Sequence, residues 1–475
     1  MNITIHQTHH SIADFDGVFE YLKDNFTDSK DGIHLFPELF LTGYPLQDLC
    51  LQKSFINSYQ SFLQQVKNFF INECDLTDTC LLIGGLDYDL TEAGIPKSIR
   101  NVIFQYSSDI HGKAIYTKRL LPNYDIFDEQ KYFTKGNESH ILSIFGKNFG
   151  LLICEDMWNS SFHAEDPALE LHQKITQEKV DLDGILNLSA SPFIIDKQKS
   201  RIDRAKEISS YFGCPFYYAN RVGAEDEILF DGQSFVVNDQ EIIHIGKRFL
   251  PDLVETKLHH KKPASKKANL KSAITWEELF KAQLNLSQKP AIMDRWTDNQ
   301  CQEVLEALCF GFQDYAKKNG FKKFSIALSG GMDSALVLTI IRLCLKNDQK
   351  LEAIYMPSIH SSALSYDLSF DLCKNLGISL TTVPIKFMHS TAKNLFEQTF
   401  DEKFEGLTDE NVQSRLRGLF IYTRSNQHGS MVVNTSNKSE LAVGYSTQYG
   451  DSVGAISILG DIYKSQVYRL TEYIN

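Results

Sequence analysis

The 475-residue sequence lacks the patterns that mark several large classes of protein. Its nine cysteines form no Cys-x-x-Cys pair and show no metal-site spacing, which argues against a disulfide scaffold or a zinc module and favours reduced thiols in a cytoplasmic protein. No stretch reaches the roughly 20 apolar residues that a membrane span requires. The first residues contain neither a basic region nor an apolar run, so we expect no signal peptide and no membrane partner.

Positive charge is also scarce. The 48 lysines and arginines are outnumbered by 60 aspartates and glutamates, which gives a net charge of -12. A surface of that average sign repels polyanions, so we expect no nucleic-acid partner. Internal repeats and low-complexity tracts are absent as well. The remaining composition, 43% hydrophobic and 23% charged, is that of an ordinary globular protein long enough for at least two domains.

Short apolar runs alternate with amphipathic stretches over the first half of the chain, which is typical of a layered α/β domain. The predicted strands are 3–7, 33–36, 80–86, 102–106, 149–153, 184–188, 215–219 and 234–237, and the predicted helices are 55–70 and 201–212. At 258–267 the sequence becomes basic and contains a proline, which indicates an exposed linker. We therefore assign residues 1–257 to a first domain, 258–290 to a linker and 291–475 to a second domain.

The second domain shows the strand–helix alternation of a parallel sheet. After a predicted helix at 301–318, predicted strands alternate with predicted helices. These elements are 324–328, 334–346, 351–356, 363–376 and 380–384. The fold class expected for the whole chain is therefore α/β.

A loop at 329–334, Ser-Gly-Gly-Met-Asp-Ser, joins the first strand and helix of this second pattern. Two glycines let the backbone approach an anion closely, and the start of a helix presents unpaired N–H groups to it. Asp333 can hold a magnesium ion that neutralises phosphates. A Gly-Gly turn with a polar helix cap is the alternative, but the complete strand–loop–helix context favours a phosphate site. The Walker A sequence is missing.

These six residues match the loop of the ATP pyrophosphatase superfamily, whose members adenylate a substrate and release pyrophosphate. The loop alone leaves GMP, asparagine and NAD synthetases open. Segments 411–418, 434–441, 444–451 and 460–464 closely resemble, in the same order, segments of NAD synthetases. This resemblance covers essentially all of residues 300–475. It implies a doubly wound parallel sheet, ATP as a substrate and Mg²⁺ as the metal.

The resemblance also implies roles for individual residues. ATP contacts are expected from Ser329, Gly330, Gly331, Asp333, Ser334, Thr435 and Lys464. A deamido-NAD site is expected from Asn411, Arg415, Glu440 and Asp451. Asp333 and Glu440 are the expected magnesium ligands. Taken alone, such charged residues would more often form surface ion pairs, but their position inside matching segments favours binding.

In the first domain, polar residues follow three of the apolar runs. Glu38 follows Phe-Pro, Lys118 lies in Tyr-Thr-Lys-Arg-Leu-Leu-Pro, and Cys154 ends an apolar run and is followed by two acids. A nucleophilic thiol needs a base and a partner for the developing oxyanion. A buried structural cysteine is the more common role. The polar turn after Cys154 favours the nucleophile instead.

The three contexts, in this order, resemble the Glu-Lys-Cys triad of the nitrilase superfamily. Over nearly all of residues 1–245 the sequence looks like the glutaminase domain of glutamine-dependent NAD synthetases. The resemblance implies a nitrilase-like αββα sandwich in which Glu38 is the general base, Cys154 attacks the glutamine amide and Lys118 stabilises the oxyanion. It implies a glutamine pocket formed by Tyr124, Glu155, Ser191 and Lys197.

Both halves together resemble the family of glutamine-dependent NAD synthetases. The resemblance implies a ligase that uses glutamine, ATP and deamido-NAD, with ammonia passed from the first site to the second. It implies a homo-oligomer formed by pairing of synthetase domains, and a second domain that lacks its C-terminal end. Two alternatives stay open on the sequence: another ATP pyrophosphatase with a different acceptor, and a catalytically idle binding protein that keeps the fold.

Overall fold

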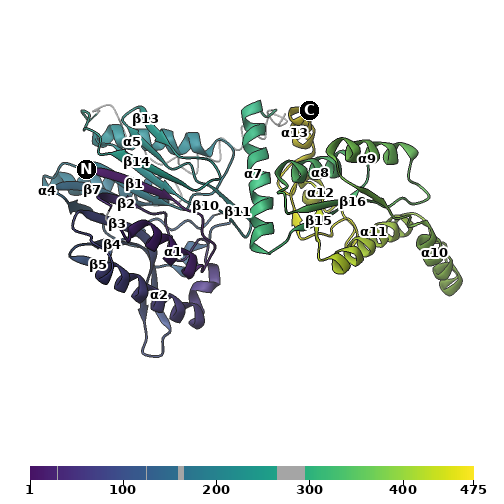
Figure 1. Ribbon diagram of the computed structural model, residues 1–475, viewed down its shortest axis with the longest axis horizontal. Helices are drawn as coiled ribbons and strands as arrows, with labels where there is room; N and C mark the ends of the chain where they lie inside the picture. The colour runs from purple at the N-terminus through teal and green to yellow at the C-terminus, as the bar shows by residue number, and fades with distance from the viewer. Residues whose placement is uncertain (29, 125, 159–164, 265–294) are drawn as a thin grey trace. The chain divides into compact units, whose positions relative to one another are not determined.

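The structure, a computed structural model, describes residues 1–28, 30–124, 126–158, 165–264 and 295–475. The chain divides into two compact units, Met1–Ala291 and Ile292–Asn475 (Figure 1). The predicted linker therefore lies outside the described residues from residue 265 onward. Within the described ranges, every helix is too short or too polar to cross a bilayer.

Two six-stranded sheets form the centre of the first unit, with the strand orders β14-β1-β2-β3-β4-β5 and β13-β12-β9-β8-β7-β6. The first sheet contains β1 (Asn2–Gln7), β2 (Gly32–Leu35), β3 (Thr79–Leu90), β4 (Pro96–Ser107), β5 (Ile110–Thr117) and β14 (Asp252–Lys257). The second contains β6 (Ile141–Ile144), β7 (Lys147–Ile153), β8 (Gly184–Ser189), β9 (Phe216–Asn220), β12 (Phe235–Asn238) and β13 (Glu241–Ile245). A separate hairpin pairs β10 (Val222–Glu225) with β11 (Ile228–Asp231).

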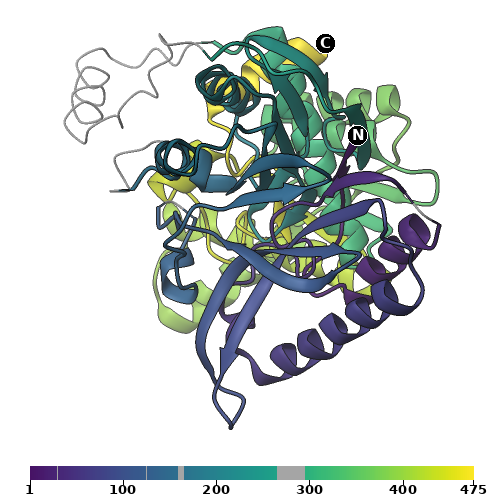
Figure 2. The same cartoon turned by 90° about the vertical axis from the view of Figure 1, so that its left-hand side faces the viewer.

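The alternation of side chains along each strand builds four layers. In β7, Leu151 and Ile153 pack in the core between the two sheets, whereas Leu152 packs in a second core with α5. Helices α1 (Phe15–Phe26) and α2 (Lys53–Asn72) cover the outer face of the first sheet. Helices α4 (Pro167–Glu178) and α5 (Lys197–Phe212) cover the second, as Figure 2 shows. The first unit is thus an αββα sandwich.

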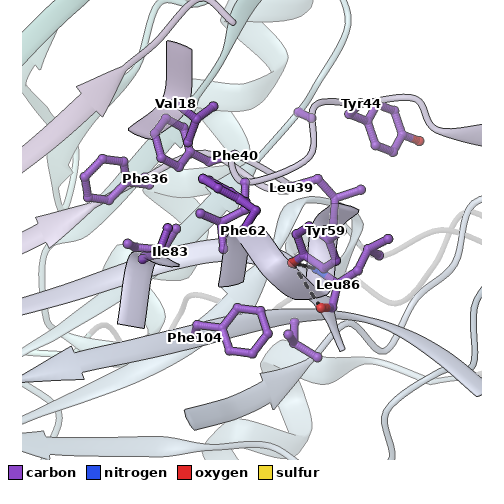
Figure 3. Close-up of a cluster of buried hydrophobic side chains, with 14 of the residues drawn as sticks. Val18, Phe36, Leu39, Phe40, Tyr44, Tyr59, Phe62, Ile83, Leu86 and Phe104 are labelled. Atoms are coloured by element: carbon purple, nitrogen blue, oxygen red, sulfur yellow. Dashed lines mark hydrogen bonds between the residues drawn. The ribbon is translucent and has the colours of Figure 1, made fainter. Parts of the chain in front are cut away.

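Aromatic side chains dominate the core under α1 and α2 (Figure 3). The apolar residues of α2 recur at helical spacing, which buries one face of the helix against the first sheet. Tyr59 is fully buried, so its hydroxyl needs partners. It donates to the carbonyl oxygen of Leu86 at 3.1 Å and accepts from the N–H of Leu86 at 2.9 Å. This core holds the strands whose ends carry the first site.

The second unit is built on a parallel sheet of order β17-β16-β15-β18-β19. Its strands are β15 (Lys323–Leu328), β16 (Lys350–Tyr355), β17 (Leu380–Thr382), β18 (Met431–Asn434) and β19 (Ile456–Ser457). Its helices are α7 (Asp298–Lys318), α8 (Met332–Cys344), α9 (Ala363–Leu376), α10 (Lys386–Phe400), α11 (Leu407–His428), α12 (Lys438–Val443) and α13 (Lys464–Ile474).

Helices lie on both faces of this sheet: α8 and α9 on one, α11 on the other (Figure 1). Chain order runs outward in opposite directions from β15 and β18, so the fold is doubly wound, as predicted. Ligands of such folds bind at the carboxyl ends of the strands where the order reverses. The loop at 329–334 follows β15 at that point. The α/β fold class is confirmed. Each predicted strand and helix occurs, the helix at 363–376 with the predicted ends and the others with ends shifted by a few residues.

Candidate active sites

The predicted triad of the first unit comes from both sheets. Glu38 lies just after β2 and Lys118 follows β5, both in the first sheet. Cys154 follows β7 of the second sheet and opens a single 3₁₀ turn, Cys154–Met157. The side chains of Glu38 and Lys118 are each only 1% exposed. Cys154 is partly buried. The triad therefore sits where the two sheets face each other, with the acid and the lysine shielded from water and the thiol partly accessible.

Lys118 binds two carboxylates. Its Nζ donates to Glu38 Oε1 at 2.6 Å and to Glu129 Oε1 at 2.8 Å. Burial alone would lower the pKa of Lys118, but the charges of Glu129 and Glu38 raise it well above its ordinary value. The ammonium group is therefore charged at neutral pH. Among the described residues two of its three protons have acceptors, which leaves the third for a substrate oxygen.

Glu38 is held by two further donors. Asn101 Nδ2 donates to its Oε1 at 2.7 Å, and the N–H of Ala190 donates to its Oε2 at 2.9 Å. Asn101 is part of β4, and Ala190 directly follows β8 of the other sheet. The carboxylate thus has a fixed orientation before any substrate arrives, which a general base requires.

Glu129 was missed by the sequence analysis. It begins the short helix α3 (Glu129–Tyr132), follows no strand and is 4% exposed. Besides Lys118 it accepts a hydrogen bond from the hydroxyl of Tyr44 at 2.8 Å. Burial, only partly offset by Lys118, raises the pKa of Glu129 to about 7. The site therefore holds a second carboxyl group that titrates near neutral pH.

Cys154 is the nucleophile candidate, and its backbone is unusual. Its φ is +45°, a left-handed conformation that is costly for any residue but glycine. Asp156 ties the following turn to the lysine segment, because its Oδ1 accepts from the N–H groups of Arg119 and Leu120 at 3.0 and 2.8 Å. Burial and the charge of Glu38 raise the pKa of the Cys154 thiol well above its ordinary value. The resting group is a thiol that needs a base.

The predicted glutamine-pocket residues gather around Cys154. The hydroxyl of Tyr124 donates to Glu155 Oε2 at 3.0 Å. The ammonium of Lys197 lies 4.7 Å from the ring centre of Trp158, and burial lowers its pKa. Lys197 also interacts electrostatically with Glu155 and Cys154. The Glu155 carboxylate and the Lys197 ammonium beside the thiol have the charges needed to bind the ammonium and carboxylate groups of an amino acid.

Ser191 is positioned by a buried arginine that the sequence analysis did not identify. Arg201 is fully buried; its Nε donates to Ser191 Oγ at 3.2 Å and its NH2 to the Ser191 carbonyl at 3.0 Å. Asp231 neutralises Arg201 through contacts of 2.8 and 2.9 Å. A cation in a predicted helix, as here, is normally taken for a solvent-exposed residue, so no local signal marked it.

The titration of Glu129 gives a measurable pH dependence. Because burial raises its pKa from near 4.5 to about 7, the unfolded chain releases this proton more readily than the folded one. The contribution of Glu129 to stability is complete below pH 4.5 and is lost as the pH rises to 7. Relative to Glu129→Gln, the wild-type free energy of unfolding should fall by up to about 3 kcal/mol across this window.

Urea denaturation at several pH values measures that difference, since other titrating groups cancel between the two proteins. If the free energies of unfolding of wild type and Glu129→Gln change in parallel with pH, Glu129 keeps an ordinary pKa.

A cavity of about 650 Å³ opens in the second unit beside the carboxyl ends of β15 and β18, where the strand order reverses. It contains residues predicted for both substrates, which the sequence places far apart. These are Ser329, Asn411, Thr435 and Asp451. The structure therefore brings the first serine of the loop and two of the predicted deamido-NAD residues, Asn411 and Asp451, to one cavity, whereas Arg415 and Glu440 do not line it. Its volume suits a small-molecule substrate.

The loop at 329–334 is closed by its own serines. Ser329 Oγ lies 3.1 Å from Ser334 Oγ, and the N–H of Gly331 donates to Ser329 Oγ at 3.2 Å. Gly330 has φ +80°, and a Cβ there would lie 2.5 Å from the carbonyl oxygen of Ser365. Only glycine fits this position. Helix α8 starts at Met332, so its free N–H groups face the loop.

Asn437 donates hydrogen bonds to both predicted metal ligands, Asp333 and Glu440. Asn437 Nδ2 donates to Asp333 Oδ1 at 3.2 Å, and its N–H donates to Glu440 Oε2 at 3.1 Å. Lys464 donates to the other oxygen of Asp333. Magnesium takes one or two protein carboxylates and completes its shell with phosphate oxygens and water. The two carboxylates here fit that requirement.

The remaining predicted residues lie on α11 and the loop after α12. Thr447 links two of them, since its Oγ1 donates to Asn411 Oδ1 at 2.9 Å and its N–H donates to Asp451 Oδ1 at 2.6 Å. Arg415 instead donates from Nε to the carbonyl oxygen of Gln448 at 3.2 Å. Arg417 lines the cavity and was not predicted.

The comparisons with known proteins agree for the two halves of the chain. The family model for NAD synthase matches residues 304–475. The glutamine-dependent NAD(+) synthetase of Thermotoga maritima is 32% identical over 493 aligned positions, which cover 100% of this chain and 81% of that protein. The protein of the same name from Aquifex aeolicus is 32% identical, with 100% and 82% covered.

Solved structures are similar over the whole chain. The structure of glutamine-dependent NAD+ synthetase from Acinetobacter baumannii in complex with ADP has a TM-score of 0.79 and 27% identity, covering 99% of this chain and 81% of that one. The crystal structure of the Cytophaga hutchinsonii protein of the same name has a TM-score of 0.75 and 19% identity, covering 100% and 81%. The latter supports the fold alone.

Proposed function

Because this chain belongs to the family of glutamine-dependent NAD(+) synthetases, we propose that it makes NAD from deamido-NAD, ATP and the amide nitrogen of glutamine. In this proposal the first unit is the glutaminase and the second unit is the synthetase. The observation that carries it is the pairing of two sites in one chain: a thiol beside a fixed Glu–Lys pair, and a phosphate loop opening into a large cavity.

At the first site, Glu38 takes the Cys154 proton as the sulfur attacks the amide carbon of glutamine. An N–H proton of Lys118 stabilises the oxyanion, and Glu38 returns the proton to the amide nitrogen so that ammonia leaves. Glu38 then takes a proton from water, which attacks the thioester, and glutamate leaves as the Cys154 thiol is restored. The hydrogen bonds from the Asn101 side chain and the Ala190 N–H hold the Glu38 carboxylate in place. The high pKa of the thiol suits this order of events, because a thiol that stays protonated until substrate binds is protected from side reactions.

At the second site, the N–H groups at the start of α8 and the serines of the loop bind ATP phosphates. Magnesium held by Asp333 and Glu440 would neutralise phosphate charge, and Lys464 adds a cation. The nicotinate carboxylate of deamido-NAD is adenylated there with loss of pyrophosphate, and ammonia from the first site displaces AMP. At neutral pH free ammonia is mostly ammonium, so passing it between sites within one protein preserves its reactivity.

A product assay tests the proposal. With glutamine, ATP, Mg²⁺ and deamido-NAD, we expect NAD, AMP, pyrophosphate and glutamate in equal amounts, and with ammonium in place of glutamine the same products without glutamate. Consumption of ATP and glutamine without NAD would favour a different acceptor. Absence of both reactions would favour a binding protein.

We also propose that copies of the chain associate through their second units in the cytoplasm. Large apolar side chains are exposed on several helices of this unit, including Leu364, Phe387, Leu395, Leu419 and Val443. Sedimentation velocity measures the assembly, and a monomer at micromolar concentration would contradict it.

A further inference from the structure

Asn187 makes a contact with the nucleophile that the reaction described above does not use. It lies in β8, directly beside Leu152 of β7 in the parallel register, and it is fully buried. Its Oδ1 accepts the backbone N–H of Cys154 at 2.8 Å. Regular pairing of β7 with β8 ends at Ile153, one residue earlier. The asparagine side chain therefore receives the first N–H group that leaves the sheet.

This contact coincides with the strained backbone of the nucleophile. Cys154 adopts φ +45°, which persists in a non-glycine residue only where the surroundings fix it. Asp156 fixes the turn from the other end, since its Oδ2 accepts the N–H of Ile153 at 3.1 Å. Between these two bonds the direction of the Cys154 side chain is set.

The NH₂ group of the Asn187 carboxamide supports the importance of the bond to Cys154 independently. Asn187 Nδ2 is buried and has no hydrogen-bond partner within the described parts of the chain. An unpaired buried donor is costly, and a leucine of similar size would avoid that cost between two apolar cores. The Asn187 Oδ1 also accepts from Ser189 Oγ, but at 3.5 Å, much longer than its 2.8 Å bond to the Cys154 N–H. The short bond to Cys154 is therefore the main reason for an asparagine here.

The geometry points to Asn187 as a positioning residue for the glutaminase reaction: it holds the Cys154 N–H and thereby aims the thiol at Glu38 and at the substrate amide. A consequence follows for the oxyanion. Because the N–H of Cys154 already has an acceptor, it is not the donor that receives the developing charge. Lys118, with one proton left, takes that role.

The inference rests on the proposed glutaminase activity, and kinetics on the full-length protein separate the two. We expect Asn187→Leu to lower kcat for glutamine hydrolysis at least about 100-fold while KM changes less than about twofold, because the pocket is kept and only the thiol is misdirected. Asn187→Asp keeps a carboxyl oxygen in the same place and should retain at least about a tenth of the wild-type kcat.

Asn238→Leu is the matched control, since Asn238 is a buried asparagine of β12 in the same sheet and its Nδ2 donates to the carbonyl oxygen of His260 at 3.1 Å. It should lower the melting temperature as much as Asn187→Leu yet leave kcat within about threefold. Should Asn187→Leu not fold, Asn187→Ala replaces it with the same expected loss.

Three results would overturn the inference: an unchanged kcat in Asn187→Leu, equal losses in Asn187→Asp and Asn187→Leu, or a rise in KM that accounts for the loss. If wild type itself fails to hydrolyse glutamine, the proposed function fails instead, which is a distinct outcome.

Discussion

Cys154→Ala is expected to abolish glutamine-dependent NAD formation while leaving ammonium-dependent formation within about twofold of wild type. In our proposal the Cys154 sulfur forms the thioester, and loss of a catalytic nucleophile costs at least about 10³-fold. The second unit has its own core and its own cavity, so it keeps its activity when ammonium is supplied. Parallel assays of glutamate and NAD measure both effects.

Cys74→Ala is the control for this experiment. Cys74 is a partly buried cysteine of the same unit that follows α2 and only borders the core under the helices. We expect full activity with either nitrogen source. Glutamate release by Cys154→Ala above about a tenth of the wild-type rate would exclude Cys154 as the nucleophile.

Asp333→Ala should have the opposite selectivity: NAD formation falls at least about 100-fold with either nitrogen source, whereas basal glutamine hydrolysis without ATP is unchanged. The substitution removes a carboxylate that binds Lys464 and Asn437 and, in our proposal, magnesium. Without this carboxylate, Lys464 and Asn437 lose their acceptor. The charge on the departing pyrophosphate is then poorly neutralised. Pyrophosphate release coupled to NAD formation is the measurement.

Asp348→Ala removes a carboxylate of the same unit whose exposed side chain pairs with Lys322 at 2.8 Å. Such surface pairs contribute little, so this control should behave as wild type. Normal NAD formation by Asp333→Ala would refute the metal-ligand role of that residue.

Sequence patterns were sufficient where chemistry is local. Cys154 and its acids end an apolar strand, and the loop at 329–334 carries its own glycine turn, closed by Ser329 and Ser334 just before α8 starts. Helix α1 was missed although its signal was present: Asp14 caps it by accepting the N–H of Gly17, and Val18, Leu22 and Phe26 recur at helical spacing.

Other residues had no local signal. Glu129 follows no strand, and it becomes part of the site only because the chain returns to Lys118 after eleven residues. Asn187 is a polar residue inside an apolar strand, and its partner is known only when β7 and β8 are paired. Edge strands such as β13 are exposed on both faces and lack the alternation by which strands are predicted.

The division of the triad between two sheets means that the first unit cannot be taken apart and stay active. Glu38 and Lys118 come from one sheet and Cys154 from the other, and the bond from Ala190 to Glu38 crosses between them. In our proposal, hydrolysis of glutamine therefore starts only once the two sheets have packed against each other. A half-made chain on the ribosome, with residues 1–150 emerged, contains Glu38 and Lys118 but not Cys154, so in our proposal it cannot hydrolyse glutamine before the second sheet is made.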